Sequence, residues 1–155
     1  MAVYSSVIDL IGDTPIVDVS VLSPTPGVRL LAKLEGQNPA GSVKDRIARA
    51  MIADAEADGT LTPGRTIIEP SSGNTGIALA MIARLRGYHL KIVLPENVSV
   101  ERRSMLEVFG AEIIPAPGRE GPNGAVRMAR RLADQHPHGV FLYQSPNAAH
   151  PTAHH

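Results

Sequence analysis

The pattern of apolar and polar positions alternates between two periods along most of the chain. Apolar residues recur at helical spacing over residues 43–58, and Gly59 follows where such a helix would end. A short run of branched apolar residues over 66–69 has the length of a buried strand. The sequence therefore predicts a helix followed by a strand, and the same succession repeats toward the carboxyl terminus.

The elements predicted after this first pair follow one another with little interruption. They are helices over residues 75–86, 100–109 and 124–135 and strands over 90–94, 111–114 and 140–143, with a Gly/Pro loop over 115–123. Successive strand–helix steps predict an α/β fold, a doubly wound and mostly parallel sheet with helices on both faces in three layers. In such sheets ligands bind beyond the carboxyl ends of the strands.

The beginning of the chain follows a different pattern. Residues 1–35 are predicted to form an N-terminal arm and a first strand over 28–34, with turns at 9–15 and 23–27. Residues 36–155 are predicted to form one βα domain that binds cofactor and substrate.

Composition narrows the class of protein. The 15 basic and 15 acidic side chains balance, and no basic stripe suggests a nucleic-acid partner. Aromatic residues are scarce at 3%, so the core must be aliphatic. Cysteine is absent, which excludes disulfides and thiolate metal sites and is compatible with a cytoplasmic location. There is no leader-like segment and no run of about 18 apolar residues that would cross a membrane.

The first chemical motif is Asn-Pro-Ala-Gly-Ser-Val-Lys-Asp-Arg over residues 38–46. Ser42 and Asp45 have the spacing of a capping box, so Lys44 is expected in the first turn of a helix. An uncharged lysine amine can form a Schiff base with an aldehyde. The alternative is an ordinary solvated lysine, which is the commoner role of such a residue.

The second motif is Ser-Ser-Gly-Asn-Thr-Gly over residues 71–76, at the predicted start of the next helix. Hydroxyl groups, glycines and backbone N–H groups at a helix start favour an anion such as a carboxylate. The alternative is a capped helix with a tight turn, but that needs only one of these polar side chains. An amine beside an anion-binding turn indicates pyridoxal-phosphate chemistry on an amino acid.

Three weaker features are interpreted as structural. The Gly-rich stretch 118–124 lacks the spacing of a nucleotide-binding loop and is expected to be flexible. Arginines 127, 130 and 131 are expected on a solvated helix face. The histidines at 136, 138, 150, 154 and 155 lack metal-site spacing, so no metal is expected.

Four stretches together resemble the cysteine synthase (O-acetylserine sulfhydrylase) family of the fold type II pyridoxal-phosphate enzymes, to which cystathionine β-synthase also belongs. They are the two motifs above, extended at Glu69-Pro70, then Leu-Pro-Glu-Asn at 94–97 with Glu-Arg-Arg at 101–103, and Tyr-Gln-Ser-Pro-Asn at 143–147. The resemblance runs in order from about Ile8 to the last residue.

The resemblance implies a cofactor, roles for six residues and a reaction. Lys44 resembles the lysine that forms the Schiff base with pyridoxal 5'-phosphate and then acts as general base, and Asn74 the asparagine that binds the ring hydroxyl oxygen. The groups that would hold the substrate carboxylate are Ser71, Ser72, Thr75 and Gln144. The implied reaction is a β-replacement that makes cysteine from O-acetylserine and sulfide, in an enzyme that is a homodimer at full length.

Two departures from the family pattern bear on this interpretation. Threonine is usual at the position of Ser71, which preserves the hydroxyl. Family members are also much longer, so the chain is expected to match their amino-terminal half. The remaining half normally carries a second glycine-rich loop for the cofactor phosphate and a Ser or Thr facing the pyridine nitrogen. Activity of the 155-residue chain by itself therefore stays open.

Alternative functions remain at this point. One is a non-catalytic domain that binds an anion or docks to another protein. Another is a relative that resembles cystathionine β-synthase or uses O-phosphoserine. A βα domain whose two motifs coincide by chance is disfavoured by the ordered run of four motifs.

Overall fold

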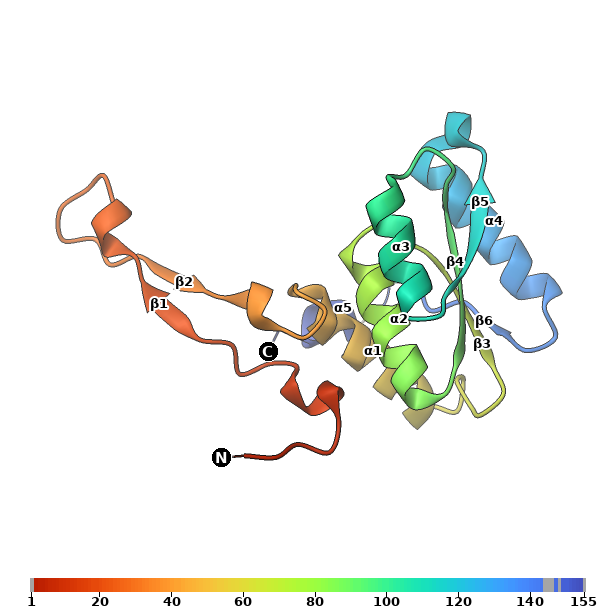
Figure 1. Ribbon diagram of the computed structural model, residues 1–155, viewed down its shortest axis with the longest axis horizontal. Coiled ribbons are helices and arrows are strands. Elements are labelled where there is room, and N and C mark those ends of the chain that lie inside the picture. The colour runs from red at the N-terminus through yellow and green to blue at the C-terminus, as the bar shows by residue number, and fades with distance from the viewer. Residues whose placement is uncertain (1, 144–146, 148, 155) are drawn as a thin grey trace.

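A four-stranded parallel sheet forms the centre of the molecule (Figure 1), as described by a computed structural model for residues 2–143, 147 and 149–154. Its strands lie in the order β5-β4-β3-β6. Their bounds are β3 Thr66–Pro70, β4 His89–Pro95, β5 Glu112–Ala116 and β6 Gly139–Val140. The mostly parallel sheet expected from the sequence is confirmed.

Helices cover both faces of this sheet, which gives three layers. The helices α1 (Lys44–Ala57), α2 (Asn74–Arg86) and α3 (Val100–Val108) lie on one side, and α4 (Gly121–Gln135) packs on the other (Figure 1). The short α5 (Ala149–Thr152) packs against α1. Gly87 ends α2 in the left-handed conformation at φ 78°, which a glycine adopts without steric cost.

Strand alternation explains how one sheet buries two cores. Ile67 and Ile92 point toward α1 and α2, while their neighbours Ile68 and Val93 pack against α4. All four side chains are fully buried. Since successive side chains on a strand face opposite sides, a continuous apolar run is what a strand covered on both faces requires.

The strand order places a topological switch at β3. The chain proceeds from β3 to β4 to β5 in one direction, and β6 then pairs with the other side of β3. Crevices in doubly wound sheets open at the carboxyl end of the strands beside such a reversal. Residues 71–76, which follow β3 directly, therefore stand where this fold places ligands.

In the central sheet and its helices, two predicted boundaries were wrong by three residues. The helix expected from residue 124 begins at Gly121, because proline is tolerated in a first turn and Pro122 occupies that position. The strand expected over 140–143 ends at Val140. Tyr143 adopts a positive φ of 40°, which does not fit a continuing ladder.

The N-terminal arm carries more regular structure than its sequence indicated. Strands β1 (Ile16–Asp18) and β2 (Leu31–Lys33) pair in antiparallel fashion as a hairpin that extends away from the helices and the central sheet (Figure 1). Among the described residues there are also four short 3-10 helices, three in or next to the arm and one before α4: η1 Val7–Leu10, η2 Ser20–Leu22, η3 Glu35–Gln37 and η4 Gly118–Glu120. The strand predicted over 28–34 is therefore only its central part, β2.

The arm is held to the central domain by hydrogen bonds from α1. Arg49 donates to the carbonyl of Ile11 at 2.7 Å. Arg46 donates to Glu35 at 2.8 Å and to the Thr14 hydroxyl at 3.2 Å. The Arg46 hydrogen bond is the main reason that the pKa of the Glu35 carboxyl is lowered to about 2, although partial burial opposes it. The partition into residues 1–35 and 36–155 stays a prediction.

Candidate functional site

A cavity of ≈ 450 Å³ lies between the start of α1 and the start of α2. It is lined by Val43, Lys44, Pro70, Ser71, Ser72, Gly73, Asn74, Thr75 and Arg102. The structure thus brings together five of the six residues that the sequence singled out. The sixth, Gln144, lies outside the described residues.

Lys44 reaches the cavity as the first residue of α1. The Ser42 hydroxyl accepts a hydrogen bond from the Lys44 backbone N–H at 3.1 Å and donates to the Asp45 carboxylate at 3.2 Å. The N-cap position is Val43 and no side chain caps it, so the capping box predicted from Ser42 and Asp45 was wrong in register. The two side chains nevertheless fix the entry of the chain into α1.

Asp45 is fully buried beside this entry. Its carboxylate also accepts a hydrogen bond from the backbone N–H of Ala40. Burial raises the pKa of the Asp45 carboxyl above its ordinary value, against the effect of these hydrogen bonds. Asp45 therefore holds residues 40–45 in shape from the protein interior, while Lys44 faces the cavity.

The turn after β3 is shaped by its own contacts. The Ser71 hydroxyl is buried and accepts a hydrogen bond from the Gly76 N–H at 2.9 Å. A Cβ at position 76 would lie 2.9 Å from the Ser71 carbonyl oxygen, so only glycine fits there. This glycine permits a close approach within the protein, whereas the sequence suggested an approach to a ligand.

Gly73 differs from Gly76 because it faces open space. A Cβ built at Gly73 meets no atom within 4 Å. Gly73 is the N-cap of α2 and has no side chain of its own to cap the helix, while the Ser71 hydroxyl accepts from the Gly76 N–H. Backbone N–H groups at a helix start attract anions, and Ser72, Asn74 and Thr75 add polar side chains around the same cavity.

Glu69 connects the end of β3 to the segment that follows β6. Its carboxylate is fully buried near the carboxyl end of β3 and accepts a hydrogen bond from the Tyr143 N–H at 2.8 Å. The segment after β6 is thereby fixed beside the turn that follows β3. Sequence analysis included Glu69 in a family motif but gave it no role. Its burial and its contact with the distant Tyr143 cannot be read from the order of residues.

Arg102 is a cavity residue that sequence reasoning missed. It lies in the first turn of α3 and donates to the Ser72 carbonyl at 3.4 Å. The available signal was the Arg-Arg pair shortly after Ser99, the N-cap of α3. A helix start after β4 faces the same edge of the sheet as the turn after β3.

A second cavity of ≈ 240 Å³ lies against Ser71 and Ser72 as well. Its other lining residues are Pro70, Val93, Pro95, Pro122, Asn123, Ala125, Val126 and Tyr143. None of these described residues is Asp, Glu, Lys, Arg or His. The Ser71–Ser72 turn thus borders one cavity that Lys44 and Arg102 line and a second cavity without such side chains.

Two kinds of feature are absent from the part of the chain that the structure describes: a metal-ligand cluster and a membrane-spanning helix. No group of three or more His, Cys, Asp and Glu side chains there is placed to bind a metal ion. None of its helices combines the length and apolar character needed to cross a bilayer.

Comparison with known proteins gives concordant matches. The family described as pyridoxal-phosphate dependent enzymes matches residues 7–155. The probable cysteine synthase of Bacillus subtilis (strain 168) is 46% identical over 154 residues, covering 99% of this chain and 50% of the relative. The chain spans about half the length of the curated relatives it matches.

Two solved structures extend the comparison to three dimensions. The crystal structure of O-ureido-L-serine synthase superimposes with a TM-score of 0.92 at 41% identity, covering 99% of this chain and 48% of that one. The O-acetylserine dependent cystathionine beta-synthase from Helicobacter pylori also gives a TM-score of 0.92, at 36% identity, covering 99% of this chain and 51% of that one.

Proposed function

We propose, from the premise that the chain belongs to the family of pyridoxal-phosphate dependent enzymes, that it forms the lysine-bearing half of a β-replacement site acting on an activated serine. The observation that carries the proposal is the shared cavity. One amine, one exposed amide, three hydroxyl side chains and a helix start line it together. None of its described lining residues is acidic, so the donor set fits a ligand that is both an aldehyde and an anion.

Lys44 and Asn74 are the residues assigned to the cofactor. The Lys44 Nζ would attach the aldehyde of pyridoxal 5'-phosphate, and the Asn74 amide would bind its ring hydroxyl oxygen. When bound, the cofactor withdraws electrons from the α-carbon of the substrate and so permits loss of the α-proton. The Lys44 amine would then take and hold that proton as general base.

Ser71, Ser72 and Thr75 are assigned to the substrate carboxylate, together with Gln144. Support for the first three comes from their place around the start of α2. Hydrogen bonds to an ionised carboxylate are stronger than neutral ones, so a cluster of donors orients the α-carbon relative to Lys44. The assignment of Gln144 rests on the sequence alone.

The proposed substrates are O-acetylserine and sulfide, which give cysteine. The curated relatives are named cysteine synthases, which supports the product. The two solved relatives are named for another product, O-ureido-L-serine, and for an O-acetylserine dependent cystathionine synthesis. O-acetylserine is therefore the amino-acid substrate that we propose, and O-phosphoserine is the alternative. The nucleophile that adds to it could also differ from sulfide.

The cofactor assignment can be tested with the chain itself. The sequence contains three lysines, Lys33, Lys44 and Lys91, so a complete set of Lys→Ala variants is feasible. Each protein is mixed with pyridoxal phosphate, the Schiff-base absorbance is recorded, and the adduct is reduced with borohydride and located by peptide mapping. We expect the label on Lys44 and loss of the absorbance band only in Lys44→Ala.

Two results would contradict the assignment. Label on Lys33 or Lys91 in the wild type would show that the amine at position 44 is not the attachment site. A chain that stays colourless at saturating cofactor would show that these 155 residues do not bind it by themselves. Cysteine formation from O-acetylserine and sulfide, assayed on the coloured protein, then tests the substrates.

A further inference from the structure

Two basic side chains, Lys44 and Arg102, line the candidate cavity, and the proposed function uses only Lys44. Arg102 projects from the first turn of α3, on a different element from every other lining residue. Its guanidinium donates to the carbonyl of Ser72, the second residue of the turn over 71–76.

The charge of Arg102 is not matched by an acid. No described carboxylate lies within salt-bridge distance of it. The adjacent Glu101 is occupied elsewhere, because hydrogen bonds from its own backbone N–H and from the Ser99 hydroxyl hold the pKa of its carboxyl below the ordinary value. A guanidinium without an acidic partner at the edge of a cavity is available to an anionic ligand.

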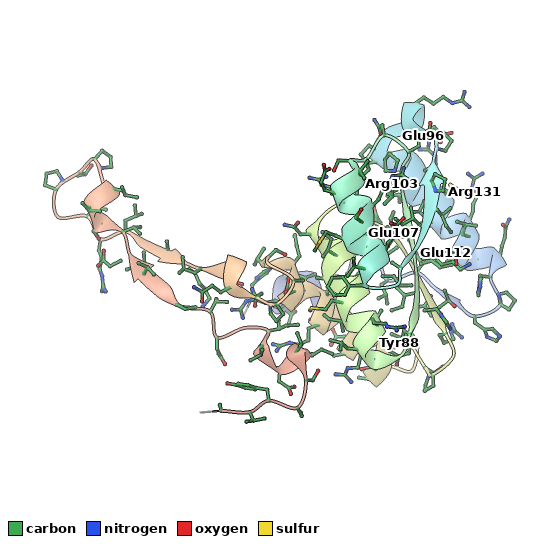
Figure 2. All side chains as sticks on the ribbon, in the orientation of Figure 1. Tyr88, Glu96, Arg103, Glu107, Glu112 and Arg131 are labelled. Carbon is green, nitrogen blue, oxygen red and sulfur yellow. The ribbon has the colours of Figure 1, made fainter. Side chains whose placement is uncertain are left out.

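The neighbouring arginine provides a contrast within the same helix turn. Arg103 donates to the carbonyl of Glu96 at 2.8 Å and does not line the cavity. Figure 2 shows Arg103 on α3 and Glu96 in the loop above it. The two arginines therefore have the same charge and nearly the same position, but only one of them faces the proposed substrate turn.

We propose that Arg102 is a substrate-binding residue whose guanidinium pairs with the carboxylate of the amino acid held at the Ser71–Thr75 turn. This inference rests on the proposed function for the identity of the ligand. The contact at 3.4 Å to the Ser72 carbonyl is longer than an optimal hydrogen bond, so little interaction is lost when the guanidinium turns to a carboxylate. The site then selects serine derivatives with a free carboxylate against neutral ones.

The test measures binding without cofactor or turnover. The probes are N-acetyl-L-serine and N-acetyl-L-serinamide, which have similar shape but differ in the charge of the carboxyl group. Backbone amide resonances of residues 72–75 in the isotope-labelled chain are followed by NMR during titration. The wild type is expected to prefer the carboxylate by about tenfold or more, the size of one charge-assisted hydrogen bond.

Three variants separate charge recognition from a structural effect. Arg102→Gln should remove most of the preference for the carboxylate, Arg102→Lys should keep part of it, and the matched control Arg103→Gln should keep all of it. Equal preference in wild type and Arg102→Gln overturns the proposal, and so does parallel weakening of both probes, which is what a merely structural residue would cause. Failure of Lys44 to form the Schiff base would refute the cofactor assignment and leave this selectivity measurement unaffected.

Discussion

The fully buried carboxylate of Glu69 accepts a hydrogen bond from the backbone N–H of Tyr143 at 2.8 Å, across 74 positions of sequence. The bond joins the end of β3 to the segment after β6, on the two sides of the point where the strand order reverses. Tyr143 has a positive φ at this point. A non-glycine residue in that conformation persists only where surrounding contacts stabilise it.

Removal of this carboxylate should therefore destabilise the protein. Glu69→Ala leaves a buried N–H without its acceptor and opens a void, which is expected to lower the free energy of unfolding by about 2–4 kcal/mol. Glu69→Gln retains an acceptor oxygen and should cost less. Urea denaturation measures both. Glu112→Ala serves as control, since the Glu112 side chain is 61% exposed and its ion pair with Lys91 should contribute below about 1 kcal/mol.

The two glycines of the turn after β3 should respond differently to the same substitution. A methyl group at Gly76 would contact the Ser71 carbonyl oxygen at 2.9 Å and displace the turn. Gly76→Ala is therefore expected to lower the free energy of unfolding by about 1–3 kcal/mol. Gly73→Ala meets open space and extended backbone. Gly73→Ala should therefore change the free energy of unfolding by less than about 1 kcal/mol. A poorer N-cap lowers stability, whereas a stiffer unfolded chain raises it. Equal losses in thermal denaturation would contradict this account.

The pair between Glu35 and Arg46 should make stability depend on pH in the acid range. The pKa of Glu35 falls from an ordinary value near 4.5 to about 2 in the folded chain, chiefly through the Arg46 hydrogen bond. A lowered carboxyl pKa stabilises the folded state above the unfolded value, and the contribution disappears as pH falls from about 4.5 to about 2.

Glu35→Gln isolates this contribution. At neutral pH the variant is expected to be less stable by on the order of 1–3 kcal/mol, since the side chains of both partners are mostly buried. The difference from wild type should shrink steadily below pH 4.5 in urea titrations. A difference that is constant with pH would mean that Glu35 acts through packing and not through its charge.

Truncation of a side chain should destabilise the protein much more in the core beneath α4 than in the exposed arm. Ile68 is fully buried in the cluster between β3 and α4, and Ile68→Ala is expected to cost about 2–5 kcal/mol. Val21 lies in the arm with 93% of its surface exposed, so Val21→Ala should change stability by at most about 0.5 kcal/mol. Denaturant midpoints of the two variants test the comparison.

Sequence reasoning succeeded where local chemistry determines the structure. Gly87 marked the end of α2 because a left-handed residue is needed there, and Ser99 marked the start of α3. Lys44 and the 71–76 turn could be paired before their distance was known, because their chemistry is complementary. Only the turn follows a strand of the parallel sheet, β3, whereas α1 follows β2 of the separate hairpin.

The same reasoning failed where distant contacts decide. The loop expected before residue 124 is helical from Gly121, since Gly and Pro residues were weighted as breakers although a first helical turn accepts proline. The β1–β2 hairpin is short and exposed, without the alternation that reveals a strand. The roles of Glu69 and Arg102 depend on partners 74 and 30 positions away, which no local pattern indicates.

Two adjacent side chains connect α3 to two separate loops. Arg102 contacts the carbonyl of Ser72 after β3, and Arg103 contacts that of Glu96 after β4. A tilt of α3 would therefore change both contacts at once and alter the width of the cavity. When a carboxylate occupies the cavity, the first turn of α3 should become more rigid, and slower exchange of its amide hydrogens with deuterium would report that coupling.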